Sequence, residues 1–230
     1  MKEKYGLSII IPVLSESKKI EDIIEHLKNL DFDGSLEIIV VDGSPGGDTI
    51  KLIGDEFVLK IISAKGRGRQ MNSGASVASG EILLFLHADT YLPEDALHRI
   101  WNVMKNHKYM AGAFDLGIRS ERFIFRIIEN FSSLRSRLTR VPYGDQAIFI
   151  RKEYFERIGG YKDIPLMEDV DLMKRIRKRK DKICLIKEKV KTSPRRWEKE
   201  GVVFCTLRNW TILFLYSLGI PPEKLAKYYK

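Results

Sequence analysis

Polar and acidic residues that could bind a charged ligand follow three short apolar runs in the first ninety residues. They are Glu16 shortly after the run 7–12, which Pro12 ends, Asp42 after the run 36–41, and His87 and Asp89 after the run 82–86. A carboxylate at the end of a buried strand is costly to desolvate unless it has a partner or a ligand. If the runs are parallel strands, their carboxyl ends meet at one edge of a sheet, where ligands bind.

Each of these acids also has a purely structural interpretation. Asp42 precedes the turn sequence GSPGG, and an aspartate there often bonds the backbone N–H groups of its own turn. Asp89 lies four residues before Pro93 and could cap or turn the chain. Because two such acids end neighbouring strands, we favour a binding role for both and leave the structural alternative open.

A basic, glycine-containing loop precedes a predicted helix at residues 65–69 (KGRGR). Glycine lets the backbone approach a ligand, and the guanidinium groups of Arg67 and Arg69 suit phosphate oxygens. The pattern matches neither of the common nucleotide-binding loops. A basic loop without a ligand is the alternative.

A second acidic cluster, Glu168, Asp169 and Asp171, opens a predicted helix. Side chains three apart share a helix face, so we expect Glu168 beside Asp171 and Asp169 pointing elsewhere. Acids in a first helical turn also complement the helix dipole without any ligand.

The elements that must position these residues alternate. Apolar runs predict strands, and apolar residues at helical spacing predict helices. The expected strands are 7–12, 36–41, 59–62, 82–86, 111–116 and 147–150. The expected helices are 18–30, a short one from Thr49, 69–78, one opening at Pro93, 121–138, 168–179, 202–218 and 222–229. This order predicts an α/β fold with a mostly parallel, Rossmann-like sheet, helices on both faces and a helical C-terminal segment.

Charge is unevenly distributed along the 230 residues, whose net charge is +9. Residues 1–118 carry 13 Lys and Arg against 17 Asp and Glu, whereas residues 119–230 carry 27 against 14. Such a skew indicates an anionic partner on one side of the molecule or, more simply, solvated helix faces. No DNA- or RNA-binding pattern accompanies it, so we expect no nucleic acid.

Composition and cysteine usage exclude several classes of protein. At 44% hydrophobic residues the chain can bury a core, which excludes a disordered chain. Cys184 and Cys205 form no zinc-binding pattern, and so few cysteines suit a reducing cytoplasm. The N-terminus lacks the features of a signal peptide. Segment 201–222 contains Arg208, so we expect a helix that is buried or lies on a membrane surface, with Trp210 and Tyr216 in the core.

Several segments together resemble the family 2 glycosyltransferases, which have the GT-A fold. They are IIIPVLSE (9–16), IIVVDGS (38–44), GRGRQMNSGASVASGEILLFLHADT (66–90), and GGY and LMEDVDL within 159–172. With PYGDQAIF (142–149) and TSPRRW (192–197), the sequence is most similar to the selenodomain-associated, or arsenosugar-biosynthesis, subgroup.

The resemblance implies roles for individual residues. Pro12, Glu16 and Asp42 match nucleotide-binding positions, and Arg67 and Arg69 lie in a loop that often contacts the nucleotide or its phosphates. Asp89 matches the last acid of the D-x-D element, which holds a cation on the donor diphosphate, and His87 replaces the first acid. Asp169 matches the general base of the E-D motif, with Glu168 beside it. Arg196 and Trp197 match an R-W pair near the diphosphate and acceptor.

The implied function is an inverting transfer of a sugar from a nucleotide-diphosphate sugar to an unknown hydroxyl acceptor, assisted by Mn²⁺ or Mg²⁺. With His87 in place of a carboxylate, Mn²⁺ becomes the more plausible ion, although His87 is as well explained by packing or by positioning Asp89. The expected domain is 1–200, with a nucleotide-binding half (1–118) and an acceptor half (119–200), followed by a helical extension (201–230).

Location and acceptor are expectations of the same kind. We expect a cytoplasmic protein, with peripheral contact at the inner face of the membrane and a lipid-linked acceptor left open. One alternative function is a sugar-nucleotide nucleotidyltransferase, whose usual glycine-rich opening loop is missing near Pro12. The other is a non-enzymatic membrane-peripheral or RNA-binding module.

Overall fold

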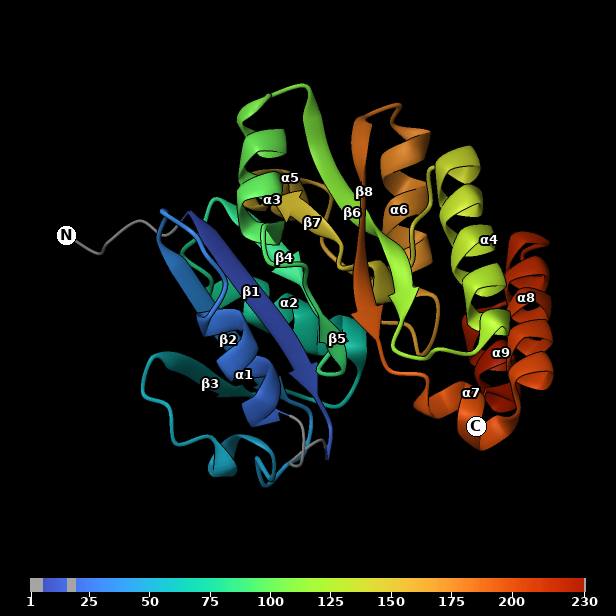
Figure 1. Ribbon diagram of the computed structural model, residues 1–230, viewed down its shortest axis with the longest axis horizontal. Coiled ribbons are helices and arrows are strands. Elements are labelled where there is room, and N and C mark those ends of the chain that lie inside the picture. Colours follow the sequence, from blue (N-terminus) through green and yellow to red (C-terminus); the bar gives the residue numbers. More distant parts are fainter. Residues whose placement is uncertain (1–5, 16–19, 230) are drawn as a thin grey trace.

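A computed structural model describes residues 6–15 and 20–229 of the chain (Figure 1). Its strands are β1 (Leu7–Val13), β2 (Leu36–Asp42), β3 (Val58–Ile62), β4 (Ile82–Phe85), β5 (Thr90–Tyr91), β6 (Tyr109–Ile118), β7 (Phe149–Arg151) and β8 (Lys182–Thr192). Its α-helices are α1 (Ile20–Lys28), α2 (Arg67–Val77), α3 (Ala96–Lys105), α4 (Phe123–Thr139), α5 (Lys152–Arg157), α6 (Glu168–Lys178), α7 (Arg195–Glu200), α8 (Val202–Ser217) and α9 (Pro222–Leu225). Single 3-10 turns lie at Ile50–Leu52, Gly144–Gln146 and Ala226–Tyr228.

The strands of the described residues form one sheet in the order β3-β2-β1-β4-β7-β6-β8-β5. Strands β1 to β4 are paired in parallel, as are β6 and β8, whereas β7 and β5 run antiparallel to their neighbours. The predicted α/β fold with a mostly parallel sheet and helices on both faces is therefore confirmed.

Helices cover both faces of the sheet because successive strand residues point to opposite sides. Ile9 and Ile11 of β1 pack into a core with α1 and α3, whereas Ile10 packs into a second core with α2 and α6. All three isoleucines are fully buried. With both faces covered, β1 reads as a continuous apolar run, and this pattern made it predictable from the sequence.

Four of the described strands and α-helices lie outside the predicted set: β5, β8, α5 and α7. Strand β8 (KICLIKEKVKT) begins with a short apolar run (183–186), but its second half alternates between exposed lysines and buried residues, so no apolar run marks the whole strand. Helix α5 has six residues, too few to show a helical period. β8 pairs with both β6 and β5 and so completes the far side of the sheet.

The C-terminal segment returns to the body of the molecule. Helices α7 and α8 follow β8, α8 lies beside α4, and α9 follows (Figure 1). Among the described residues, no helix is both long and apolar enough to cross a membrane. The division of the chain at residue 200 stays a prediction.

Candidate functional site

A pocket of about 810 Å³ lies beyond the carboxyl ends of β1 and β4, where the sheet topology predicts a ligand site. Eight of the predicted site residues line it: Pro12, Arg67, His87, Asp89, Glu168, Asp169, Arg196 and Trp197. They come from β1, the loop between β4 and β5, the amino ends of α2 and α6, and α7. The structure thus brings together residues that are up to 185 positions apart in the sequence.

Three predicted site residues do not line this pocket. Glu16 lies outside the described residues. Arg69 points away from the pocket and makes a bidentate ion pair with Asp163, with N–O distances of 2.7 and 2.6 Å. Asp42 is fully buried beside the pocket rather than in its wall.

Asp42 holds the turn that follows β2. One carboxylate oxygen accepts hydrogen bonds from the backbone N–H and the hydroxyl of Ser44, both at 2.8 Å. The other accepts from the N–H groups of Thr49 (2.7 Å) and Ile50 (3.3 Å). Burial alone would raise the pKa of Asp42, but these donors outweigh it and lower the pKa. The turn-forming alternative therefore describes this conformation, and a nucleotide-binding role for Asp42 stays a prediction.

A second hollow of about 590 Å³ adjoins this turn. Leu14, Ser44, Pro45, Ile62 and Lys65 are among its lining residues. It shares Leu14 and Lys65 with the larger pocket, so the two are contiguous. The turn organised by Asp42 thus supplies one wall of a mainly apolar extension of the site.

The acids at the start of α6 are arranged differently from the sequence prediction. Glu168 and Asp169 both line the pocket, whereas Asp171 lies outside it, paired with Lys162 and Arg175. The expectation that Asp169 points elsewhere is therefore wrong, because Asp169 lines the pocket beside Glu168. The proximity of Glu168 and Asp171 on one helix face stays a prediction. Met167, with a left-handed φ of 67°, precedes the helix and turns the chain so that its first residues face the cavity.

Asp169 is held in place by backbone donors on both oxygens. Oδ2 accepts from the N–H of Gly144 at 2.6 Å, and Oδ1 accepts from the N–H of Val170 at 2.7 Å. Glu168 accepts a hydrogen bond from Arg67 at 3.3 Å. Burial and the nearby Asp169 raise the pKa of Glu168 despite this arginine. The ion pair between Arg67 and Glu168 thus links the start of α2 to the start of α6.

The side chain of His87 is a neutral imidazole in this pocket. Its Nε2 is buried and has no hydrogen-bond partner among the described residues. Burial and the neighbouring Arg67 lower the pKa of His87 to about 3. A Cβ built on Gly144 would stand 3.1 Å from His87 Nε2 and 3.3 Å from Asp169 Oδ2, so a larger residue here would require one of these side chains to shift.

Asp145 is a pocket residue that sequence reasoning missed. Burial, followed by the charge of Asp169, raises the pKa of Asp145 to about 6; Arg135 opposes this shift, and Asp89 adds to it. Its Oδ1 is buried without a partner among the described residues. Asp145 belongs to the segment PYGDQAIF, but an isolated acid between short elements gave no local signal for a site.

The donor set of these residues suits a divalent cation. Asp89 and Asp145 supply carboxylate oxygens, which Mn²⁺ and Mg²⁺ prefer, and His87 supplies a neutral ring nitrogen, the less usual ligand for either ion. His87 Nε2 and Asp145 Oδ1 are buried polar atoms without a partner among the described residues, a deficit that a bound ion would fill. The three ligand atoms do not all lie within 4.8 Å of one another in this conformation; among the described residues, Asp31, Asp33 and His98 meet that spacing.

The C-terminal segment closes one side of the pocket. Arg196 lies over the ring of Tyr229 at 3.9 Å and bonds Glu200 at 3.2 Å. Trp197 packs edge-on against Phe125, and its buried Nε1 has no partner within the described part of the chain. Tyr229 also lines the pocket, and no pattern in the sequence marks it as a site residue.

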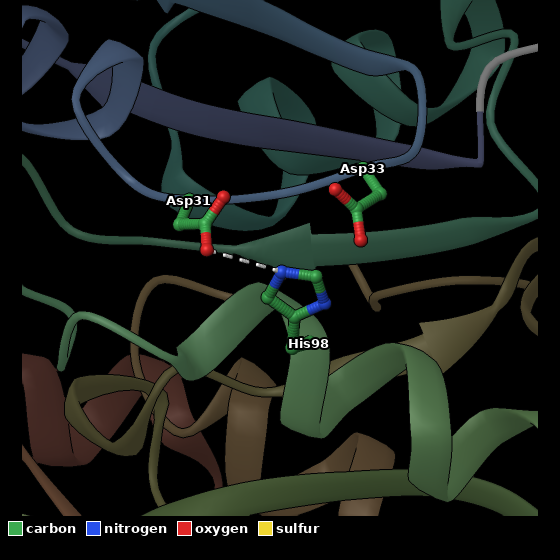
Figure 2. A group of neighbouring side chains, drawn as sticks. All are labelled: Asp31, Asp33 and His98. Carbon is green, nitrogen blue, oxygen red and sulfur yellow. Dashed lines mark ion pairs between the residues drawn. The ribbon is translucent and has the colours of Figure 1, made fainter.

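Another cluster of ionisable side chains lies apart from this pocket. Asp31 and Asp33, between α1 and β2, face His98 of α3, and Asp31 is 3.7 Å from His98 (Figure 2). The two acids are exposed, and none of the three residues lines the pocket. The cluster sits at the amino end of β2, so it has no contact with the catalytic candidates.

The chain belongs to glycosyl transferase family 2, because residues 8–162 match that family. Among curated relatives, the probable glycosyltransferase YdaM of Bacillus subtilis is 24% identical over 203 residues, covering 76% of this chain and 47% of YdaM. The PGL/p-HBAD biosynthesis glycosyltransferase of Mycobacterium bovis is 28% identical over 163 residues, covering 67% of this chain and 62% of that protein. The chain thus spans about half to three fifths of these relatives.

Solved structures share the fold. S. aureus TarS 1–349 in complex with UDP superposes with a TM-score of 0.66 at 17% identity, covering 82% of this chain and 60% of that one. Mannosyltransferase PcManGT from Pyrobaculum calidifontis, in complex with GDP-Man and Mn²⁺, gives 0.59 at 18% identity, covering 84% and 57%. The GT-A fold and the family are confirmed, whereas the arsenosugar subgroup stays a prediction. The nucleotidyltransferase and non-enzymatic alternatives are not favoured.

Proposed function

We propose that the protein is an inverting glycosyltransferase that moves a sugar from a nucleotide-diphosphate sugar to a hydroxyl acceptor, with Asp169 as general base. One observation carries the proposal: Asp89 and Asp169, from separate halves of a family 2 chain, line the same pocket together with Arg67 and His87. UDP and GDP-Man in the related structures support a nucleotide-sugar donor.

The pocket has groups for each part of such a donor. The apolar hollow with Leu14, Pro45 and Ile62 suits a nucleobase, and Lys65 lies between it and the main pocket. Arg67 and Arg196 line the main pocket, where their charges would stabilise a departing diphosphate. Asp89 and His87, with Asp145 beside them, would hold Mn²⁺ or Mg²⁺. A bound cation would neutralise negative charge on the leaving group.

The chemistry assigned to the chain is one proton transfer during one displacement. The acceptor oxygen attacks the anomeric carbon as that carbon's bond to the diphosphate oxygen breaks, and the acceptor proton moves to the carboxylate of Asp169. Attack from the face opposite the leaving group inverts the anomeric centre. The two backbone N–H bonds fix the orientation of Asp169 without neutralising it. A single carboxylate suffices, unlike the pair used by glycoside hydrolases.

The acceptor side is the less specified part of the proposal. Trp197, Tyr229 and the first turns of α8 surround the side of the pocket away from the nucleotide hollow. A cytoplasmic protein acting at the inner face of the membrane on a lipid-linked acceptor belongs to the same proposal. The exposed apolar side chains of α4 and α8 are relevant to this membrane location.

The decisive experiment compares Asp169→Asn with the wild type. Thermal-shift screening of UDP-, GDP-, dTDP- and ADP-sugars with Mn²⁺ first identifies the donor, since a ligand of the folded state raises the melting temperature. In the variant we expect donor affinity within about threefold of the wild type and turnover lower by roughly 10²–10⁴-fold, the usual contribution of a general base. Asp33→Asn, which changes an exposed acid outside the pocket, serves as the control. Normal turnover of Asp169→Asn would remove the proposed base.

A further inference from the structure

Large apolar side chains are exposed in a regular pattern on two helices. On α4 the exposed residues are Phe123, Ile127, Phe131, Leu134 and Leu138. On α8 they are Val203, Phe204, Leu207, Trp210 and Phe214, with Leu218 directly after the helix. Steps of three and four residues place each set along one side of its helix. In a helix packed only against its own protein, such a stripe would face the core.

The two stripes form one surface, here called the α4–α8 face. The rings of Phe131 and Trp210 stack 4.6 Å apart, and the helices run side by side along one edge of the molecule (Figure 1). Within α8 only Cys205 and Ile212 are buried. Val202, Leu213 and Leu215 pack partly against the core of the protein, whereas Val203, Phe204, Leu207 and Phe214 stay 54–67% exposed.

Trp210 corrects the sequence prediction. We expected it in the core, but its side chain is 44% exposed, whereas Tyr216 is half-buried against the main body. Single exposed hydrophobic residues are ordinary, but ten or more on two adjacent helices mark a surface that binds a partner or a membrane.

Basic residues border the α4–α8 face. The exposed ones are Arg122 and Arg140 at the two ends of α4, and Arg195 and Lys199 on α7. The exposed acids in the same segments are Glu121 and Glu198. This excess of positive charge next to apolar side chains complements an anionic lipid surface, which offers negative headgroups above a hydrocarbon interior.

The length of α8 determines how it would meet a bilayer. Its 16 residues extend about 24 Å at 1.5 Å per residue, less than the roughly 30 Å of a hydrocarbon core. The helix is therefore too short to span a bilayer and would meet it side-on; because α8 is apolar around most of its circumference, the basic residues next to it come from α4 and α7.

We propose that the α4–α8 face docks onto an anionic phospholipid bilayer, with the apolar side chains of both helices inserted among the lipids and the bordering arginines on the headgroups. Docking here would hold the α7–α8 side of the pocket next to the membrane, since Arg195 and Arg196 of α7 and Cys205 and Asn209 of α8 also line the pocket. The proposal is independent of the glycosyl transfer, because lipid binding is measured without donor or acceptor.

The test is flotation of the purified full chain with vesicles. In low salt, we expect it to float with vesicles of 30% phosphatidylglycerol in phosphatidylcholine and to be released by 0.5 M NaCl. With Phe123→Ser plus Phe214→Ser, we expect roughly tenfold weaker partitioning, because two inserted aromatic side chains are lost. The matched control is Leu52→Ser plus Phe57→Ser, two residues that are also exposed but lie in the N-terminal half. It should float like the wild type.

A charge variant separates attraction from insertion. Arg122→Gln plus Arg140→Gln should weaken binding to the phosphatidylglycerol vesicles roughly five- to tenfold and flatten its salt dependence. Binding to pure phosphatidylcholine vesicles should not change. Circular dichroism and thermal unfolding of every variant would show that the fold is intact.

Three results would overturn the proposal. The first is no flotation of the wild type with the anionic vesicles in low salt. The second is an equal loss of binding in the Leu52/Phe57 control. The third is a stable dimer in sedimentation velocity that the Phe123/Phe214 variant converts to monomer without any vesicle binding, which would make the α4–α8 face a contact between two copies of the chain.

Discussion

At the scale of single residues, acids that look equivalent in the sequence serve different purposes in the structure. Asp42 and Asp89 each follow an apolar run of residues. Both carboxylate oxygens of Asp42 accept hydrogen bonds within its own turn, whereas Asp89 lines the pocket. Glu168 and Asp169 face the cavity, and Asp171, two residues on, is held by Lys162 and Arg175. Which acid is available to a ligand depends on its local donors, and residue type alone does not reveal these.

Asp42 gives a prediction about stability and pH. Replacing it with Asn removes an acceptor from Thr49 and Ile50, so we expect a loss of about 2 kcal/mol in the free energy of unfolding at pH 7. Because the folded pKa is lowered, the stabilisation by the wild-type carboxylate is present above its unfolded pKa of about 4. It is lost as the pH falls through the lower folded value, so the difference between variant and wild type should shrink below about pH 4.

Urea unfolding at pH 7, 5 and 3 measures this effect. Asp48→Asn, an exposed acid in the same loop, is the control and should change stability by less than about 0.5 kcal/mol. A difference between Asp42→Asn and the wild type that stays constant across this pH range would contradict the assignment of the lowered pKa to Asp42.

Asp145 gives a prediction about ligand binding. It lies close enough to Asp89 and Asp169 for their charges to act on it, and a cation in the pocket would relieve that repulsion. We therefore expect Asp145→Asn to weaken Mn²⁺-dependent donor binding by at least roughly tenfold while leaving binding without metal nearly unchanged. Calorimetric titrations with Mn²⁺ and with EDTA make the comparison. Equal losses in both would show a structural rather than a cation-related role.

At the scale of elements, the close packing of α2 on the sheet positions Arg67. A Cβ on Gly74 would come within 2.5 Å of Ile10 and 3.1 Å of Val41, so α2 lies directly on β1 and β2. This contact brings the amino end of α2, with Arg67, to the carboxyl ends of the strands. The small residues of 69–78 in the sequence thus reflect a packing requirement as well as a helix.

Gly74→Ala tests that contact. We expect a loss of about 1–3 kcal/mol in the free energy of unfolding, the usual result of adding a methyl group to a filled core. Gly54→Ala is the matched control, because nothing lies within 4 Å of its added Cβ. Chemical denaturation of both variants gives the comparison, and equal stability of the two would mean that α2 can move away from the sheet without cost.

The sequence predicted the elements whose pattern is local. Strands β1, β2 and β4 are mainly apolar, with Ser8 and Glu37 as the polar residues inside β1 and β2, and their carboxyl ends led to Asp89 and the pocket. Strand β8 escaped prediction because its lysines interrupt the apolar pattern on the solvent side. Asp145 escaped because it joins the site through tertiary structure: Gly144, its neighbour, meets Asp169 across 25 residues of sequence.

At the scale of the whole molecule, residues from the first strand and from the last described turn meet at the pocket. Pro12 lies near the N-terminus, and Tyr229 is the last described residue. The three C-terminal helices carry the chain from the far side of the sheet back to the strand ends, and the exposed side of α8 forms the α4–α8 face (Figure 1). No periodicity in the sequence encodes such a return, because it depends on contacts between segments that are distant in the chain.

Substitution of Tyr229 tests whether the contact of the C-terminal segment with the pocket affects ligand binding. The ring of Tyr229 lies 3.9 Å from the guanidinium of Arg196, and both residues line the pocket. Removing the ring frees Arg196 from a cation–π contact worth roughly 0.5–2 kcal/mol and opens the wall. We expect Tyr229→Ala to weaken ligand binding about three- to tenfold with little change in melting temperature. Tyr228→Ala, whose side chain is 72% exposed, should behave like the wild type. If both variants bound ligand equally well, the C-terminal turn would be a surface feature, and the pocket would be complete without it.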